Sequence, residues 1–377
     1  HRRQRVAVRR LVRGHSTHSQ PNEEAFNPFG VLPCRTRTRG CESASGCKGL
    51  KRCCWSAQGM DPRLVILSRG PGLYSTKRLV EEAEAAGWAV RIIDPLSLDY
   101  VIDDTGVRVF NKGWLVECEA VIPRIGYSIT RRGVSVLSQF ESTGVIVINK
   151  SEGIVNSRDK MLSCKMMSVA GIPVPVTAHV GNWEGTARAV NLVGGTPCVV
   201  KANEGTHGSG VFLAHSDQQA RQLVYQMLER DMSPLIQEYI QESHGQDIRA
   251  LVVGGEVVAA MRRKAHGSEF RSNFPLGGSV EPIEISQRQS EIACLAAKTL
   301  NLDFAGVDML ESRGGPLVLE VNSSPGLEGI ESACGKIVAG KVVELLDRKL
   351  REAQAEGGSD SAAMDSNGVS DYSQAYD

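Results

Sequence analysis

The chain lacks several patterns by which membrane proteins and common enzyme classes are recognised. No apolar run approaches the roughly 20 residues that a membrane-spanning helix needs, and none of the ten cysteines forms a CxxC pair. A GK[ST] phosphate-binding loop and a convincing Ser/His/Asp or Cys/His arrangement are also missing. These absences exclude a membrane-embedded protein, a zinc or thioredoxin-like motif, a P-loop enzyme and a side-chain nucleophile. Singly scattered cysteines predict a reducing, cytoplasmic location.

Acidic residues are scarce at the start of the chain and basic residues are absent from its end. Residues 1–59 hold twelve Lys/Arg and three Asp/Glu, whereas residues 352–377 hold six acidic residues and no basic one. Residues 1–59 show no sustained periodicity and are interpreted as a basic, disordered extension. A nucleic-acid-binding arm and a transit peptide are alternatives, but we favour translated upstream sequence before a native start at Met60. Residues 352–377 have few large apolar side chains and predict a disordered acidic tail.

Strands and helices alternate over residues 60–150. The predicted strands are Leu64–Leu67, Ala89–Ile93, Ala120–Pro123 and Val145–Ile148, with helices over 76–86 and 131–142. This alternation predicts an α/β domain with a small parallel sheet. Because ligands of such sheets bind beyond the carboxyl ends of the strands, Arg69, Tyr74 and Arg124 are candidate substrate-binding residues. Plain surface positions are the alternative for all three.

A glycine-rich stretch lies between two predicted strands in the middle of the chain. Strand Pro197–Lys201 precedes Glu204, Gly205 and Gly208, and strand Val211–His215 follows. Glycines let backbone N–H groups approach a phosphate without a Cβ in the way. The pattern therefore predicts either a flap over nucleotide phosphates, with Lys201 on the preceding strand, or an ordinary structural turn.

Lys160 opens a predicted helix, Met161–Ala170, where a positive charge opposes the helix dipole. We therefore expect Lys160 to have an anionic partner elsewhere, with a solvated lysine as the alternative. Further helices are predicted over Gln218–Glu229, 284–300 and Ile337–Leu350, the last of which could pack beside the hairpin described next. Strands are predicted at Leu235–Ile240, Ala250–Val253 and Glu256–Met261.

Acidic residues converge in a predicted β-hairpin near the C-terminal end. The apolar runs Ala305–Leu310 and Pro316–Val321 flank a Gly-Gly turn. Side chains alternate along a strand, so Glu320 and Asn322 share one face and the fold-back brings Asp308 opposite them. Two carboxylates and an amide oxygen favour Mg²⁺ shared with substrate phosphates. Solvated surface acids are the alternative.

A basic connection from Arg262 to Asn273 precedes this hairpin and has Glu269 as its one acidic residue. Because the connection adjoins the strands that lead to the acidic hairpin, we expect it to bind an anion. A solvated charged face is the alternative. A glycine-rich flap, a basic loop and an acidic hairpin together describe a site for a nucleoside triphosphate.

With these features the chain resembles the ATP-grasp ligases, most closely the RimK type. The resemblance extends from about Met60 to Arg351. The superfamily features are the metal hairpin and Asp247-Ile-Arg249, whereas Arg271-Ser-Asn273 and Ser324–Glu331 indicate the RimK-like branch. The other matching stretches are Leu67–Arg69, Leu73–Ser75, Val121–Gly126, Arg158–Lys160, Val199–Lys201, Glu204–Thr206, Gln237–Ile240, Ala305–Asp308 and Glu320–Asn322.

The resemblance implies an α+β ATP-grasp fold that follows the parallel-sheet domain. Its domains would be a pre-ATP-grasp domain over 60–150, a small lid subdomain over 151–237, and a large subdomain with the metal site over 238–351.

The resemblance also implies roles for individual residues. Lys160, Lys201, Glu204, Gly205, Gly208, Ser272 and Asn273 would bind the ATP phosphates, with Glu238 and Tyr239 at the adenine and Asp247 nearby. Asp308, Glu320 and Asn322 would bind two Mg²⁺ or Mn²⁺ ions. Arg249 and Arg271 would stabilise the transferred phosphate, and Ser324 joins the candidate substrate-binding residues.

The activity implied is a carboxylate–amine ligase that forms an amide through an acyl-phosphate. The RimK type adds glutamate to the C-terminus of ribosomal small-subunit protein six, or makes poly-glutamate, and the family suggests a homo-oligomer, a tetramer. A ligase for a small cofactor or an amino-group carrier protein is the alternative. A non-catalytic RNA- or ribosome-binding protein on the same scaffold is a third hypothesis, which the intact metal and phosphate residues disfavour.

Overall fold

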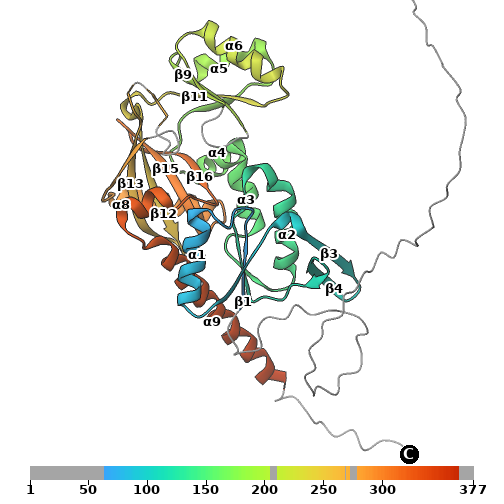
Figure 1. The fold of residues 1–377 in the computed structure, drawn as a ribbon. Helices are drawn as coiled ribbons and strands as arrows, with labels where there is room; N and C mark the ends of the chain where they lie inside the picture. Colours follow the sequence, from blue (N-terminus) through green and yellow to red (C-terminus); the bar gives the residue numbers. More distant parts are fainter. Residues whose placement is uncertain (1–62, 204–209, 268, 272–277, 365–377) are drawn as a thin grey trace, which may run out of the picture. The chain divides into compact units, whose positions relative to one another are not determined.

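Four β-sheets organise the part of the chain that the computed structural model describes (Figure 1). The described backbone covers residues 63–203, 210–267, 269–271 and 278–364, with side chains to residue 356. The predicted extension at residues 1–59 and the end of the predicted acidic tail lie outside these ranges. Within them, no helix is long and apolar enough to cross a membrane.

The first sheet is parallel, as predicted for an α/β domain. Its strand order is β2 (Ala89–Ile93), β1 (Arg63–Leu67), β6 (Ala120–Pro123), β7 (Ile146–Val147). Strand β1 is fully buried from Leu64 to Leu67, which explains its unbroken apolar sequence. Its helices are α1 (Tyr74–Ala85) and α2 (Thr130–Ser142). Gly87, with φ +90°, follows α1 in the left-handed conformation that ends helices.

A second, antiparallel sheet follows β2 and was not predicted. It consists of β3 (Leu98–Asp103), β4 (Gly106–Asn111) and β5 (Trp114–Leu115). Most of β3 is exposed, so its burial does not alternate. The sequence signal was the pair of turns, Asp104–Gly106 and Lys112–Gly113, between apolar segments. Single turns of 3-10 helix occur in the described chain at η1 (Pro95–Ser97), η2 (Tyr127–Ile129), η3 (Trp183–Gly185) and η4 (Gln241–Ser243).

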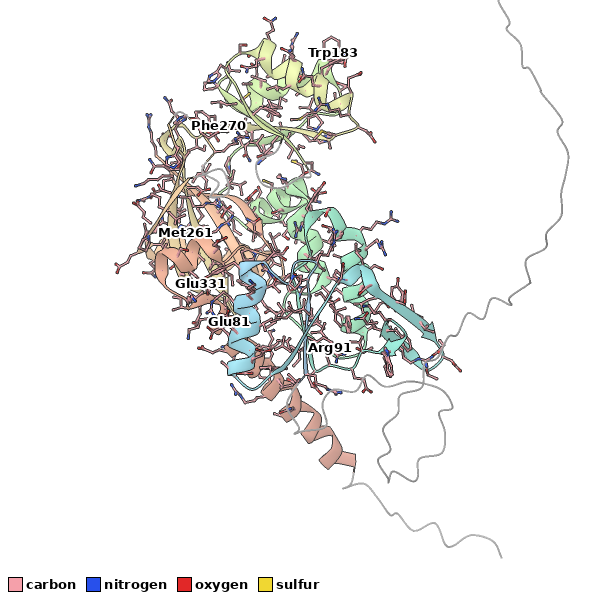
Figure 2. The ribbon with its side chains drawn as sticks, viewed as in Figure 1. Glu81, Arg91, Trp183, Met261, Phe270 and Glu331 are labelled. Carbon is pink, nitrogen blue, oxygen red and sulfur yellow. The ribbon has the colours of Figure 1, made fainter. Side chains whose placement is uncertain are left out.

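Two helices lead from the parallel sheet into a small antiparallel sheet. Helix α3 (Ser151–Arg158) was not predicted, and α4 (Lys160–Val169) was. The sheet has the order β10 (Val211–Ala214), β9 (Cys198–Ala202), β11 (Pro234–Glu238), β8 (Thr177–His179). Helices α5 (Thr186–Leu192) and α6 (Asp217–Leu228) cover one face of it and bury a core of their own. Trp183 lies at the surface of this subdomain (Figure 2).

The largest sheet carries the acidic hairpin. Its order is β14 (Ser279–Pro282), β13 (Glu256–Lys264), β12 (Gln246–Val253), β15 (Phe304–Ser312), β16 (Gly315–Asn322), antiparallel throughout. Helix α7 (Gln287–Thr299) packs on one face of this sheet. Helices α8 (Glu328–Cys334) and α9 (Val338–Met364) follow the hairpin.

Helix α9 differs from its prediction in length and in position. It continues to Met364, so residues 352–364 are helical where the sequence predicted a disordered tail. The helix packs against α1, β12 and β13, and not chiefly beside the β15–β16 hairpin. Leu346 and Val342 of α9 share a buried cluster with Leu79 of α1 and Leu251 of β12. The parallel-sheet region and the large sheet are therefore joined through one common core.

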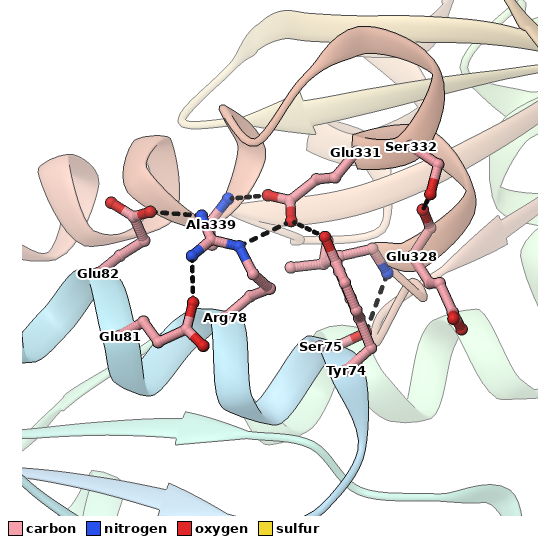
Figure 3. A network of polar contacts seen from close by, with 10 residues as sticks. Tyr74, Ser75, Arg78, Glu81, Glu82, Glu328, Glu331, Ser332 and Ala339 are labelled. Atoms are coloured by element: carbon pink, nitrogen blue, oxygen red, sulfur yellow. Dashed lines mark hydrogen bonds and ion pairs between the residues drawn. The ribbon is translucent and has the colours of Figure 1, made fainter.

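A buried polar network also joins these two regions (Figure 3). Glu331 of α8, whose side chain is fully buried, accepts hydrogen bonds from Arg78 Nε and Tyr74 Oη of α1, each 3.1 Å long. Its other oxygen accepts from the backbone N–H of Ala339 at 3.1 Å. Arg78 also pairs with Glu81 and Glu82 on its own helix. Glu331 of α8 thus satisfies donors from two other helices, α1 and α9, at once.

We expect Glu331→Gln to lower the free energy of unfolding by about 2 kcal/mol, because a buried charge-assisted bond to Arg78 is lost while Arg78 keeps Glu81 and Glu82. Chemical denaturation would measure the change. Glu328→Gln is the matched control, since Glu328 lies on the same helix and is exposed. Equal stability of the two variants would contradict the structural role given to Glu331.

Candidate active site

The three predicted metal ligands converge on the β15–β16 hairpin. Asp308 stands opposite Glu320 in the strand register, and Gly306 stands opposite Asn322. The amide nitrogen of Asn322 lies 3.4 Å from Asp308 Oδ2 and 3.3 Å from Glu320 Oε1. A bulge directly after Asp308 shifts the register. The fold-back predicted from the sequence is therefore present.

Asp308 is neutralised by arginines as well as being a candidate ligand. Its carboxylate is 1% exposed and accepts two bonds from Arg249, of 2.7 and 2.6 Å, and one from Arg263 of 2.9 Å. Burial alone would raise its pKa, but the two guanidiniums hold the pKa of Asp308 at about 2. The sequence argument expected a metal cation to offset this charge, whereas guanidiniums offset it in the structure.

The residues at the hairpin fit a divalent cation. Glu320 forms no ion pair within the described residues, so its carboxylate is available as a ligand beside Asp308 and Asn322. The described chain contains no group of three or more His, Cys, Asp and Glu side chains that could hold a metal alone. Two carboxylates and an amide are the kind of incomplete oxygen set that Mg²⁺ completes with water and substrate phosphates.

Arg263 is a site residue that the sequence analysis missed. It is 3% exposed, pairs with both oxygens of Asp247, and also bonds to Asp308. Burial alone would lower the pKa of Arg263, but Asp308 and Asp247 raise it above its ordinary value. Asp247, predicted near the nucleotide, is therefore a buried partner of Arg263. Strand alternation was the available signal, since Arg262 and Arg263 must face opposite sides of β13.

Four described basic residues of the connection, Arg262, Arg263, Lys264 and Arg271, pair with acidic side chains. Residues 262–264 belong to strand β13, where Arg262 contacts Glu281 and Glu311 and Lys264 contacts Glu281. Arg271 forms bonds of 2.9 and 2.8 Å to Glu269, whose pKa this pairing lowers to about 2. Ser272 and Asn273 lie outside the described residues.

Lys201 reaches the site from the small sheet. It is 6% exposed, and its ammonium donates to Gln237 Oε1 at 2.9 Å. It lines a cavity together with Arg158, Lys160, Glu320 and Asn322. The pKa of Lys201 is lowered to about 8, chiefly by burial. Cys164 and Glu320 act to raise it, and Lys160 acts to lower it. A buried cation thus faces the candidate metal ligands.

Hydrogen bonds join the turn before α4 to Asn203, the residue that precedes the glycine-rich stretch. Asp159 caps α4 through the N–H of Leu162 at 2.9 Å and accepts from Asn203 Nδ2 at 3.1 Å. Lys160 Nζ donates to the Asn203 carbonyl at 3.2 Å, so a carbonyl dipole is one partner of the lysine for which an anion was expected. Glu204, Gly205 and Gly208, the predicted flap residues, lie outside the described residues.

Glu238 and Tyr239 stand at the end of β11. The carboxylate of Glu238 accepts from the N–H of Val176 at 3.3 Å. The Tyr239 hydroxyl is hydrogen-bonded to His244 Nδ1, and burial raises the pKa of Tyr239. Glu238 is the last residue of the strand that carries Gln237, the partner of Lys201, and Tyr239 follows it.

The four candidate substrate-binding residues separate into different environments. Arg69 follows β1 and is exposed, whereas the Tyr74 hydroxyl donates a hydrogen bond to Glu331. Arg124, by contrast, donates from Nη2 to the Pro325 carbonyl at 2.7 Å. Ser324 is the neighbour of Pro325, and its hydroxyl is buried without a hydrogen-bond partner in the described chain. The structure therefore brings Arg124 to the Ser324 loop, and ties Tyr74 to helix α8.

We expect the affinity for Mg·ATP to fall as pH rises through about 8, where Lys201 loses its proton in the free protein. Phosphate groups are already ionised at this pH, because their second pKa is about 6. Binding of the triphosphate must therefore add a proton to Lys201, so the affinity falls by up to about tenfold per pH unit. Titration with a non-hydrolysable ATP analogue from about pH 7 to 9.5 would measure this. Lys201→Arg, which stays charged, should abolish the dependence. An unchanged slope in that variant would assign the effect to another group.

Comparisons with known proteins identify the fold and the family. Solved ATP-grasp ligases share the fold. PsnB, solved with a variant precursor, Mg and ADP, is 21% identical with a TM-score of 0.59 over 78% of this chain and 99% of its own. A RimK domain protein of Sphaerobacter thermophilus is 20% identical with a TM-score of 0.58, covering 75% and 98%.

Family models assign the chain more narrowly. A model described as the RimK PreATP-grasp domain matches residues 63–154, and one described as the RimK-like ATP-grasp domain matches residues 157–346. A probable alpha-L-glutamate ligase of Aeromonas salmonicida is 46% identical over 288 residues, which span 76% of this chain and 97% of the relative. The protein belongs to the RimK-like ATP-grasp family. The resemblance and the ATP-grasp fold class predicted from the sequence are confirmed.

Proposed function

We propose that this protein is an ATP- and Mg²⁺-dependent ligase that adds glutamate to the C-terminal carboxylate of an acceptor polypeptide. The observation that carries the proposal is the acidic hairpin of Asp308, Glu320 and Asn322, with Lys201 lining the same cavity. The relatives named probable alpha-L-glutamate ligase support glutamate as the amino acid that is added. The PsnB structure, solved with a precursor variant, Mg and ADP, supports a peptide acceptor and the metal.

Electrostatics gives the residues their roles. Lys201 and Lys160 attract the triphosphate, and Arg249, held in place by Asp308, offsets charge on the phosphoryl group in transfer. The acceptor carboxylate attacks the γ-phosphate to give an acyl-phosphate and ADP. The glutamate amine then attacks the acyl carbon, and amide and phosphate are released. When bound at Asp308, Glu320 and Asn322, two Mg²⁺ or Mn²⁺ ions would neutralise the phosphate charge.

We further propose that the acceptor is ribosomal small-subunit protein six and that the enzyme works as a homo-oligomer, a tetramer, in the cytoplasm. The acceptor and the oligomeric state are those that the resemblance to the RimK type implies, and the chain matches the RimK-like ATP-grasp domain. The free thiols of the five described cysteines suit a reducing compartment. Arg271 joins Arg249 as a candidate phosphate-binding residue in this scheme.

Mass spectrometry of reaction products tests the proposal. The protein would be incubated with ATP, glutamate, Mg²⁺ or Mn²⁺, and the ribosomal protein. Acceptor masses raised by whole glutamyl residues, with ADP formed in equal amount, are the expected result. A peptide substrate is contradicted if an amino-group carrier or a small cofactor gains glutamate and the ribosomal protein does not. Ligase activity itself is contradicted if no acceptor gains mass although RNA or ribosomes bind.

A further inference from the structure

Two arginines converge on one loop without a carboxylate partner. Arg124 directly follows β6, and Arg158 is the last residue of α3. Arg158 Nη2 donates to the carbonyl of Ile125 at 2.7 Å, next to Arg124, which itself reaches the carbonyl of Pro325 at the same distance. Within the described residues neither arginine forms an ion pair. Backbone carbonyls alone hold the two guanidiniums in place.

The electrostatics of this pair is unfavourable without an anion. Burial and, as a smaller effect, the nearby charge of Arg158 together lower the pKa of Arg124 to about 10. Burial also lowers the pKa of Arg158, although Tyr127 and Glu320 act in the opposite direction. Nη1 of Arg124 and Nε of Arg158 are buried and have no hydrogen-bond acceptor among the described residues. Buried charged donors without acceptors are rare in folded proteins unless a ligand completes them.

The surroundings supply further unused hydrogen-bonding groups. The hydroxyls of Ser323 and Ser324 are buried and unpaired within the described chain, and both precede the Pro325 carbonyl that Arg124 contacts. Gly306 of β15 lets this loop lie on the sheet, since a Cβ there would stand 2.9 Å from Pro325 Cβ. Arg158 lines the same cavity as Glu320 and Lys201. The arginine pair is therefore next to the metal ligands but separate from them.

The chemistry of the reaction limits which anion can occupy this position. The proposed function assigns the triphosphate to Lys160 and Lys201, and it requires the acceptor carboxylate to reach the γ-phosphate at the metal hairpin. The remaining anionic groups are the carboxylates of the incoming amino acid, which take no part in bond formation but must be fixed so that the amine is aimed. Guanidiniums match a carboxylate in both charge and geometry.

We propose that Arg124 and Arg158, with the Ser324 hydroxyl, bind a carboxylate of the incoming glutamate and thereby select the amino-acid substrate. The inference rests on the proposed function, and it adds Arg158 to the candidate substrate site. A site built around a buried charged pair rejects analogues that leave the pair unsatisfied. Glutamine lacks the side-chain carboxylate and glutamic acid α-amide lacks the main-chain one, so these two amines identify which carboxylate is held.

Steady-state kinetics of Arg124→Gln and Arg158→Gln tests the proposal. We expect KM for glutamate to rise at least about 30-fold in each variant, with KM for ATP and for the acceptor within about twofold of the wild type. Arg131→Gln, an exposed arginine of α2, is the matched control. The wild type should discriminate against one of the two amide analogues, and both variants should lose that discrimination. A rise in KM for ATP or for the acceptor instead would overturn the assignment.

Glutarate separates this inference from the proposed function, because it has two carboxylates and no amine and cannot react. With Mg²⁺ and a non-hydrolysable ATP analogue, it should raise the Tm of the wild type and of Arg131→Gln, but not that of the Arg124 and Arg158 variants. This pattern would support the carboxylate site even if no glutamyl product forms. Equal stabilisation of all four proteins, or unchanged KM for glutamate in an active enzyme, would overturn the inference while the proposed function stands.

Discussion

Replacing Glu320 by glutamine is expected to lower ATP-dependent amide formation at least about a thousandfold, equivalent to about 4 kcal/mol of transition-state stabilisation. The fold should survive, because Glu320 is half-buried and its contact within the described chain is a 3.3 Å bond from Asn322. The lost charge weakens cation binding beside the transferred phosphate. Product formation by mass spectrometry and Mg²⁺-dependent thermal stabilisation by an ATP analogue would both measure the effect.

Glu311→Gln is the matched control for this prediction. Glu311 lies on the same hairpin but is exposed and pairs with Arg262, so its loss should change turnover by less than about twofold. Asp308→Asn is less informative, since Asp308 also holds Arg249 and Arg263 and its loss affects folding as well as metal binding. Wild-type turnover by Glu320→Gln would show that the hairpin does not hold the catalytic cation.

Arg263→Met is expected to destabilise the protein by about 3–5 kcal/mol, because removing one partner leaves buried carboxylates uncompensated. Asp247, 5% exposed, would lose the ion pair that joins β12 to β13, and Asp308 would keep only Arg249. Urea denaturation would measure the loss. Arg262→Met is the control, since Arg262 is the next residue on β13 and makes only partly exposed contacts with Glu281 and Glu311. Similar losses in both variants would argue against a special role for the buried pair.

Acid unfolding provides a second measurement of the same cluster. The folded-state pKa of Asp308, about 2, lies below its ordinary value of 3.8. Its contribution to stability is therefore present above about pH 4 and is lost as pH falls through that value toward 2. In Arg263→Met the burial of Asp308 is less compensated, so its pKa should rise and acid unfolding should begin at higher pH. Coincident acid transitions in the two proteins would contradict the coupling.

The site that the sequence predicted best is the one built from local geometry. A hairpin register fixes which side chains face each other, so Asp308, Glu320 and Asn322 could be placed together from strand alternation and a Gly-Gly turn. Lys201 could be placed on its strand for the same reason. These predictions needed no knowledge of how distant segments pack.

The residues that the sequence did not reveal depend on contacts between distant elements. From the sequence, Arg263 was one of several residues in a basic run that was expected to bind an anion. Only the pairing of β13 with β12 turned it toward Asp247 and Asp308. Tyr74 looked like a loop residue at a strand end until α8 supplied Glu331. Arg158 gained its significance because the loop after β6 brings Arg124 beside it.

By itself, the sequence determined the parallel and hairpin strands, the acidic hairpin and the family, because hydrophobic periodicity and short motifs are local properties. The tertiary structure alone decided which charges neutralise one another: Arg249 and Arg263 with Asp308, and Arg78 with Glu331. It also decided that Arg124 and Arg158 have no carboxylate partner among the described residues. Ion pairing depends on distances of a few ångströms between residues far apart in the chain. Such distances are set by packing of the whole core.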